Sequence, residues 1–199
     1  MAQIAEDRLA PGLIDAQVNG GGGVLFNHDP SVASLRTITA AHRRCGTTGL
    51  LATLISDGPE RRQAAVAAVT QAMAEGVAGL LGLHLEGPHL NPERRGIHPP
   101  GPLGPPTDQD LALACSLRVG VTLVTLAPEI VADSAIRTLV AAGVRVALGH
   151  SAATYDQARA GFAAGITGVT HLFNALSPLT TREPGAREVL THGLALMPR

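Results

Sequence analysis

Three residues of metal-ligating type stand where short apolar runs of the sequence end. Glu86 closes such a run just before a Gly-Pro turn, and His150 and His171 close two later runs. A carboxylate and two imidazoles on one rigid rim can bind a divalent cation and leave positions open for water, as hydrolytic zinc sites do. A single histidine in such a place is more often a hydrogen-bonded rim or core residue, so the hypothesis of a metal site depends on all three residues meeting.

The spacing of these residues predicts that they do meet. His171 follows His150 by about one short βα repeat, and Glu86 precedes His150 by about two average repeats of a (β/α)8 barrel. Repeat spacing returns side chains to the same mouth of a barrel. The sequence therefore predicts a hydrolytic metal centre with Glu86, His150 and His171 as ligands.

The elements that must position these residues alternate along the chain. Runs rich in Val, Leu, Ile and Thr predict buried strands at Leu13–Asn19, Thr47–Ile55, Gly79–Glu86, Val119–Leu126, Val144–His150 and Gly168–Phe173. Ala-rich stretches between them predict helices at Ser31–Arg44, Pro59–Glu75, Asp108–Leu117, Ile130–Ala142 and Thr154–Ala164.

This alternation indicates an α/β fold with a parallel sheet covered by helices, either doubly wound or closed into a (β/α)8 TIM-type barrel. The barrel is favoured because function-like residues end many of the strands. A full barrel takes roughly 250 residues, and we count about six strands. We therefore expect an incomplete barrel, with about two βα units missing at the C-terminus.

Composition limits the classes of partner. The 199 residues are 45% hydrophobic and 16% charged, with 15 Lys and Arg against 16 Asp and Glu, and no basic block. One domain is expected, with a small-molecule partner and neither nucleic acid nor a membrane surface. Met1–Arg8 does not resemble a secretory signal, so a cytoplasmic location is expected. Cys45 and Cys115 are too few for a disulfide framework and are predicted to be core thiols.

Three further features bear on the predicted site. Residues Asn91–Pro106 hold six of the 14 prolines and predict a long ordered loop over one end of the sheet. His84 alternates with Glu86 on the same strand but lies deeper, so we assign it to packing or to support of the site rather than to ligation. The run Gly20–Gly23 lacks the Lys-Ser/Thr of a phosphate loop, and a permissive strand-to-helix turn is the better interpretation.

Several segments together resemble a known family. They are Ala10–Gly23, Gly46–Asp57, Gly82–His98, Leu126–Glu129 and above all Gly149–Gly185, which includes the strings HLFNA and REPG. In these segments the chain is similar to the N-acetylglucosamine-6-phosphate deacetylases of the amidohydrolase superfamily. The resemblance implies a (β/α)8 barrel with a small β-sandwich, and hydrolysis of N-acetylglucosamine 6-phosphate to glucosamine 6-phosphate and acetate.

The resemblance also implies roles for individual residues. Glu86, His150 and His171 correspond to the family's metal ligands. Gln17 and Asn19 stand where many amidohydrolases carry two histidines, which fits the branch that uses one metal, most often zinc, since neutral amides are poor zinc ligands. Members of the family commonly form homodimers, so a homodimer is implied.

The family's substrate contacts fall on Ile97, His98, Asn174, Ala175 and Arg182. From its position alone, His98 is an exposed loop residue and Arg182 a solvated loop arginine. The resemblance places His98 above the metal and Arg182 near the sugar phosphate, where a guanidinium can form a bidentate contact.

The departures from the family pattern concern both ends of the chain. Residues 1–199 would form a partial metal-dependent hydrolase barrel, with the flanking β-sandwich largely absent. The family's general-base aspartate follows an eighth strand, and His192 does not resemble the family's later histidine motif, so no catalytic residue is assigned. We therefore expect these residues alone to be nearly inactive in deacetylation.

Two alternatives to a complete deacetylase stay open at this point. One is a truncated, inactive fragment that binds metal or sugar phosphate. The other is an amidohydrolase that acts on a different N-acyl substrate, although the HLFNA and REPG strings favour the deacetylase. The coding DNA after the Arg199 codon would distinguish a fragment from a complete enzyme.

Overall fold

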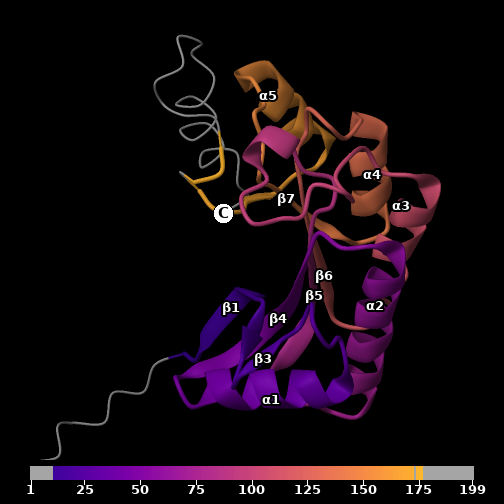
Figure 1. The fold of residues 1–199 in the computed structure, drawn as a ribbon. Coiled ribbons are helices and arrows are strands. Elements are labelled where there is room, and N and C mark those ends of the chain that lie inside the picture. Colours follow the sequence, from indigo (N-terminus) through magenta and orange to yellow (C-terminus); the bar gives the residue numbers. More distant parts are fainter. Residues whose placement is uncertain (1–10, 173, 177–199) are drawn as a thin grey trace, which may run out of the picture.

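Six strands form one parallel sheet in the computed structural model, which describes residues 11–172 and 174–176 (Figure 1). In order across the sheet they are β1 (Leu13–Val18), β4 (Thr47–Ile55), β5 (Leu80–Glu86), β6 (Val121–Leu126), β7 (Arg145–Leu148) and β8 (Gly168–Val169). Each strand pairs in parallel with the next one in this order. The predicted strands are therefore confirmed, although β8 is shorter than predicted.

The sheet curls into part of a barrel. β1 and β8 are its two edge strands in the described part of the chain, yet Gln17 on β1 lies beside His171, which comes just after β8, with their Nε2 atoms 3.4 Å apart. Opposite edges of a flat six-stranded sheet would lie much farther apart, because neighbouring strands are about 4.8 Å apart. The predicted partial (β/α)8 architecture is confirmed.

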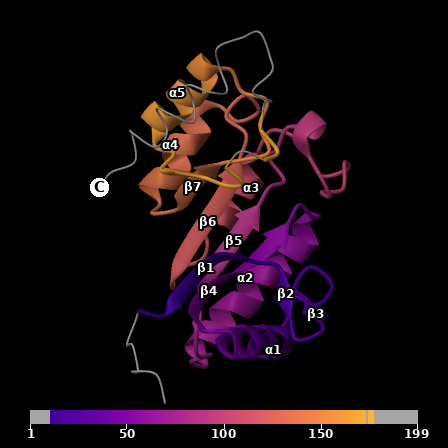
Figure 2. The same cartoon turned by 90° about the vertical axis from the view of Figure 1, so that its left-hand side faces the viewer.

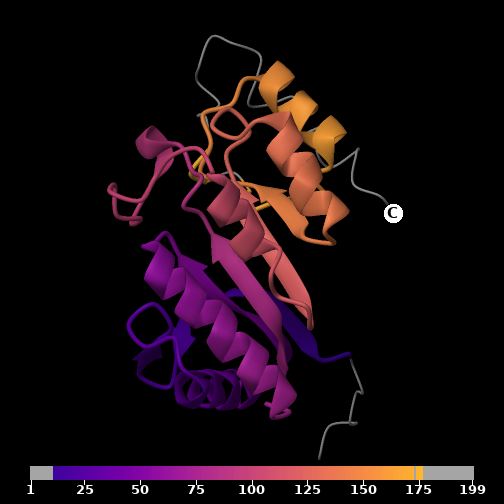
Figure 3. The ribbon, with the colours of Figure 1, turned by 90° about the vertical axis from the view of Figure 1, so that its right-hand side faces the viewer.

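Helices follow the strands and cover one face of the sheet. They are α1 (Val32–Arg43), α2 (Pro59–Ala74), α3 (Asp108–Ala114), α4 (Asp133–Ala141) and α5 (Tyr155–Ala164). Figure 3 shows α2, α3 and α4 in front of the strands, and Figure 2 shows the strands from the opposite side. No helix in the described ranges has the length and apolarity that a membrane span requires.

Local signals in the sequence set the ends of these helices. Thr107 and Asp110 form a capping box at the start of α3, and Thr154 and Gln157 form another at the start of α5. α5 ends at Gly165, whose φ of 119° is left-handed.

Buried apolar side chains from the strands and helices form one continuous core. On α2 the buried residues Ala65, Ala68, Val69 and Ala72 recur at helical spacing. The large side chains of the core include Leu35, Ile38, Leu50, Leu54, Leu83, Ile136, Leu139 and Leu148. This packing holds the strands rigidly and so fixes the positions of the residues at the strand ends.

Two smaller predictions need correction. Cys45 is exposed rather than buried, because α1 ends at Arg43 and Cys45 lies in the turn that follows, while Cys115 is half-buried. The glycine run forms a hairpin rather than a strand-to-helix turn. Strands β2 (Gly20–Gly21) and β3 (Val24–Leu25) pair in antiparallel fashion, and the turn between them has two left-handed glycines.

A buried polar layer crosses the strands just below the mouth of the barrel. His84 on β5 is 1% exposed, and its Nδ1 lies 3.0 Å from the carbonyl oxygen of Ala16. A carbonyl only accepts, so Nδ1 carries the proton, and Nε2 accepts from the Thr125 hydroxyl at 2.7 Å. Thr125 in turn contacts the Thr170 hydroxyl at 2.7 Å. Both ring nitrogens of His84 are therefore hydrogen-bonded to groups within the barrel wall.

The polar layer predicts that the protein loses stability in mild acid. Burial is the main cause that lowers the pKa of His84 from 6.5 to about 4. The unfolded chain therefore binds a proton on this side chain more readily than the folded chain as pH falls below 6.5. The contribution of neutral, buried His84 to stability is fully present above pH 6.5 and is lost as pH falls below that value. Because of His84, the free energy of unfolding should fall by about 2 kcal/mol between about pH 7 and about pH 5.

Denaturant unfolding of the parent protein and of His84→Gln at these two pH values checks this expectation. The parent should lose more stability on acidification than the variant does. His28→Gln is a matched control, because His28 is exposed, and it should follow the parent. An equal loss in the parent and in His84→Gln would show that His84 is not the source.

Candidate metal centre

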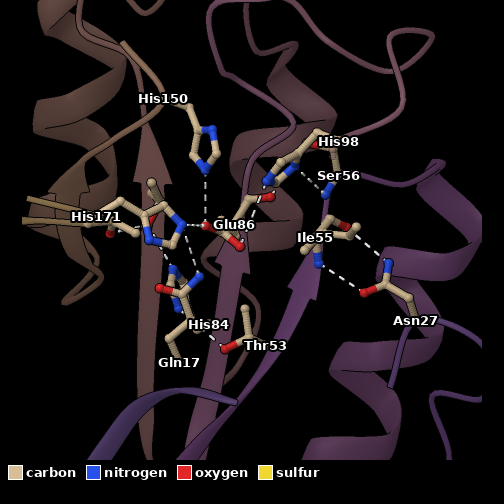
Figure 4. A network of polar contacts seen from close by, with 12 residues as sticks. Gln17, Asn27, Thr53, Ile55, Ser56, His84, Glu86, His98, His150 and His171 are labelled. Carbon is tan, nitrogen blue, oxygen red and sulfur yellow. Dashed lines mark hydrogen bonds and ion pairs between the residues drawn. The ribbon is translucent and has the colours of Figure 1, made fainter. Parts of the chain in front are cut away.

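The three predicted metal ligands lie together at the mouth of the barrel (Figure 4). Glu86 is the last residue of β5, His150 comes two residues after β7, and His171 comes two residues after β8. One ligand atom from each residue lies within 4.8 Å of the others, and in the described ranges no other such group of His, Cys, Asp or Glu is found. The convergence that the repeat spacing predicts is present.

Both imidazoles face the same carboxylate oxygen. The Oε1 atom of Glu86 lies 3.2 Å from Nε2 of His150 and 2.7 Å from Nε2 of His171. Glu86 and His150 are buried, whereas His171 is partly open to solvent. Burial alone would raise the pKa of Glu86, but the hydrogen bond with His150 and the neighbouring histidines outweigh it and lower that pKa to about 2. The site therefore contains an ionised carboxylate.

The second nitrogen of His150 shows how the group fits a cation. Its Nδ1 lies 2.8 Å from the carbonyl oxygen of Arg94, which only accepts, so Nδ1 carries the proton of the neutral ring. Nε2 then faces the Glu86 carboxylate, where it donates a hydrogen bond when the ring is protonated and offers a lone pair to a cation when the ring is neutral. Burial works to lower the pKa of His150, but Glu86 and the Arg94 carbonyl together raise it above its ordinary value. The pair thus favours a positive charge between its atoms, and the donor set suits a divalent metal.

The backbone at both histidines is in a sparsely populated conformation. The φ angles are 49° at His150 and 56° at His171, in the left-handed region that non-glycine residues seldom adopt. Such conformations cost of the order of 1–3 kcal/mol each and persist where surrounding contacts fix them. At His150, one such contact is the hydrogen bond from the Asn91 amide to its carbonyl oxygen, at 2.9 Å.

The residues expected to replace a second metal site lie beside the cluster. Gln17 is 3.4 Å from His171, and Asn19 lines the same cavity with a buried amide nitrogen that has no hydrogen-bond partner among the residues that the structure describes. Both side chains are neutral amides, which zinc binds poorly. Their position is consistent with the prediction of a single metal, which stays a prediction.

A cavity of about 440 Å³ opens above the three residues. Four of the five predicted substrate contacts line it: Ile97, His98, Asn174 and Ala175. Ile97 is 84% exposed and therefore lies at the rim. The fifth predicted contact, Arg182, lies outside the described residues.

His98 differs from the exposed loop residue that its position in the sequence suggested. The side chain is 1% exposed, and its Nδ1 lies 3.2 Å from the backbone nitrogen of Ser56 and 2.8 Å from the Ser56 hydroxyl. A backbone N–H only donates, so Nδ1 of His98 accepts and Nε2 carries the proton. Nε2 lies 3.8 Å from Oε2 of Glu86. Burial is the main cause that lowers the pKa of His98 to about 4.

Sequence reasoning missed Ser56 and Arg94, which orient His98 and His150. Ser56 directly follows β4, and Glu86 is the last residue of β5. A polar residue at the end of a strand was therefore the signal that could have identified Ser56. Arg94 acts through its backbone carbonyl oxygen, a group that every residue has, so its role could not be recognised from its side chain. His84 lies outside the three-residue group, as predicted.

Comparisons with known proteins agree with the fold and with the family resemblance found in the sequence. A model described as "Amidohydrolase family" matches residues 8–199. The N-acetylgalactosamine-6-phosphate deacetylase of Shewanella sp. (strain ANA-3) is 46% identical over 183 residues, which are 92% of this chain and 46% of that protein. The chain thus spans about half the length of the curated relatives it matches.

Solved structures give the same result. The N-acetylglucosamine-6-phosphate deacetylase of Pasteurella multocida matches with a TM-score of 0.85 and 36% identity, over 90% of this chain and 48% of that one. A variant of the Mycobacterium smegmatis enzyme, solved in complex with N-acetyl-D-glucosamine-6-phosphate, matches with a TM-score of 0.81 and 36% identity, over 96% of this chain and 52% of that one. The resemblance found in the sequence is confirmed, and the chain belongs to the amidohydrolase family.

Proposed function

We propose that residues 1–199 carry the metal centre and part of the substrate pocket of a deacetylase that acts on N-acetylhexosamine 6-phosphates. The products would be the free hexosamine 6-phosphate and acetate. The observation that carries this proposal is the convergence of two histidine Nε2 atoms on Oε1 of Glu86 beneath the cavity. The similarity to deacetylases of sugar phosphates supplies the substrate class.

Glu86, His150 and His171 would hold one divalent cation, which we propose to be zinc because its usual protein ligands include carboxylate and imidazole. Such a cation supplies Lewis acidity that polarises an amide carbonyl and activates water. His98 would donate its Nε2 proton to the acyl oxygen as negative charge develops there. The neutral ring suits this role, because burial lowers the pKa of His98 to about 4 and a neutral donor persists near pH 7.

The rest of the pocket would bind the sugar. Asn174 and Ala175 line the cavity beside His171, and Ile97 lies at its rim. Arg182 is proposed to bind the phosphate, and the proton transfers to the departing amine are assigned by the resemblance to an aspartate on an eighth strand. A sugar phosphate is a metabolite of the cell interior, so we place the protein in the cytoplasm.

The identity of the hexosamine has two candidates, which differ in configuration at one ring carbon. N-Acetylglucosamine 6-phosphate is favoured by the Mycobacterium smegmatis complex. N-Acetylgalactosamine 6-phosphate is favoured by sequence identity. The Shewanella N-acetylgalactosamine-6-phosphate deacetylase is 46% identical to this chain, and the Pasteurella multocida N-acetylglucosamine-6-phosphate deacetylase is 36% identical. Both sugars place the same acetamide and phosphate groups, so the metal centre serves either.

The proposed metal centre predicts the metal content of the protein. We expect close to one divalent ion per folded chain, because one carboxylate and two imidazoles converge while Gln17 and Asn19 are neutral. Elemental analysis after dialysis measures this stoichiometry, and the double variant with His150→Ala and His171→Ala should lose the ion. His28→Ala is the control, because His28 is exposed and is not part of the three-residue group. Two ions per chain, or unchanged binding in the double variant, would contradict the proposed site.

The proposed function also predicts the class of substrate. The native protein that carries this sequence should release acetate from at least one of the two N-acetylhexosamine 6-phosphates much faster than from unphosphorylated N-acetylglucosamine. Parallel assays with both phosphates decide between the two candidate sugars. Release from neither phosphate, with turnover of another N-acyl compound, would favour the alternative amidohydrolase.

Arg182→Lys tests the proposed phosphate contact. A guanidinium can bind two phosphate oxygens at once and an ammonium cannot do so in the same geometry. We expect kcat/KM for the phosphorylated substrate to fall by about tenfold or more, since a charge-assisted contact is typically worth that much. Activity on unphosphorylated N-acetylglucosamine should change little. Equal losses on both substrates would show that Arg182 has a structural role.

A further inference from the structure

The carboxylate of Glu129 joins three segments around the metal centre, although it is not part of the three-residue group. Glu129 lies just after β6, and its Oε1 accepts from the backbone nitrogen of Ala152 at 2.6 Å and from the side-chain amide of Asn91 at 2.9 Å. Its Oε2 accepts from the Ser151 hydroxyl at 2.6 Å. One side chain therefore connects the end of β6, the proline-rich loop and the segment directly after His150.

Two of these contacts hold the backbone that leaves His150. Ser151 and Ala152 directly follow this residue, whose φ of 49° is unfavourable without support. Ser151 is 2% exposed, and its hydroxyl also accepts from the backbone nitrogen of Ala153 at 3.0 Å. Glu129 thus satisfies the polar groups of a turn that must stay in place for His150 to face Glu86.

The third contact holds the loop that orients the ring of His150. Asn91, which donates its side-chain amide to Glu129, also donates its backbone N–H to the carbonyl oxygen of His150 at 2.9 Å. Three residues later, the carbonyl of Arg94 accepts the Nδ1 proton of His150. The backbone and the ring of His150 are therefore both fixed by segments that Glu129 binds.

The same turn reaches the segment after His171. The backbone nitrogen of Ser151 donates to the carbonyl oxygen of Ala175 at 3.1 Å, and Ser151 forms an isolated bridge with Leu176. Ala175 lines the cavity. A shift of Ser151 would consequently move a wall of the cavity as well as His150.

We propose that Glu129 is a positioning residue for the metal centre, which holds the turn after His150 and the Asn91–Arg94 segment so that Nε2 of His150 faces Glu86. The proposal rests on the proposed function insofar as it concerns metal affinity. A carboxylate offers two acceptor oxygens and no donor, which matches the three donors that two segments, Asn91 and Ser151–Ala152, direct at Glu129. Gln retains one such oxygen, so Glu129→Gln should preserve part of the arrangement and Glu129→Ala none of it.

The test compares metal affinity and site geometry in the parent, Glu129→Ala and Glu129→Gln. Competition with a chromophoric chelator gives the Zn²⁺ dissociation constant, and the absorption spectrum of bound Co²⁺ reports the geometry of the ligands. We expect Glu129→Ala to weaken Zn²⁺ binding by about ten- to a hundredfold, as loss of partners of metal ligands typically does, and to change the Co²⁺ spectrum. Glu129→Gln should recover part of both.

Glu75→Ala is the matched control, because Glu75 pairs with Arg36 on the surface and makes no contact with the site. It should leave the affinity and the Co²⁺ spectrum unchanged. If Glu129→Ala is too unstable to purify, Ser151→Ala removes the 2.6 Å contact with Glu129, together with the bond from the Ala153 amide, and should weaken Zn²⁺ binding in the same direction.

Hydrogen exchange in the metal-free protein separates this proposal from the proposed function. The backbone amides of Asn91 and Ala152 should exchange faster in Glu129→Ala than in the parent and in Glu75→Ala. Unchanged exchange at both amides, or a parent-like Zn²⁺ affinity and Co²⁺ spectrum in Glu129→Ala, would overturn the positioning role. A parent protein that binds no Zn²⁺ would instead overturn the proposed function, while faster exchange in the variant would still support the role of Glu129 in fixing His150.

Discussion

A buried carboxylate oxygen shared by two imidazole nitrogens is the constraint on which the rest of the site depends. Glu86 is 2% exposed and ionised, and an isolated buried charge is costly unless positive charge and hydrogen bonds surround it. His150 and His171 approach Oε1 only through left-handed backbone conformations. The arrangement therefore depends on contacts elsewhere that stabilise it, and the loops around the mouth of the barrel supply them.

The histidines near Glu86 differ in which ring nitrogen carries the proton, because each ring contacts a backbone group that can only donate or only accept. The Ala16 carbonyl places the proton of His84 on Nδ1, and Thr125 takes up its Nε2, so this ring belongs to the barrel wall. The Arg94 carbonyl does the same to Nδ1 of His150 but leaves Nε2 facing the carboxylate. The Ser56 amide reverses the pattern at His98, which presents an N–H to the cavity. Backbone groups thus fix which nitrogen of each ring faces the Glu86 carboxylate or the cavity, and whether that nitrogen carries the proton.

Much of the fold could be predicted from the sequence, because buried parallel strands are apolar on both faces. Thr47–Ile55 was predicted residue for residue, and the strand ends bring Glu86, His150 and His171 together wherever the repeat continues. The burial of His98 and the contacts of Ser56 and Glu129 could not be predicted, because they depend on how the loop after β5 folds across the mouth. Cys45 was misassigned for a local reason, since α1 ends two residues earlier and its buried face does not extend that far.

The most direct test of the central claim is anomalous diffraction at the zinc edge from crystals of the native protein grown with zinc. We expect one strong anomalous peak per chain, with Oε1 of Glu86 and Nε2 of His150 and His171 at about 2.0–2.2 Å from it. A peak bound by other residues, or no peak while the two histidines keep their contacts with Glu86, would contradict the claim that this carboxylate and these imidazoles form a metal centre.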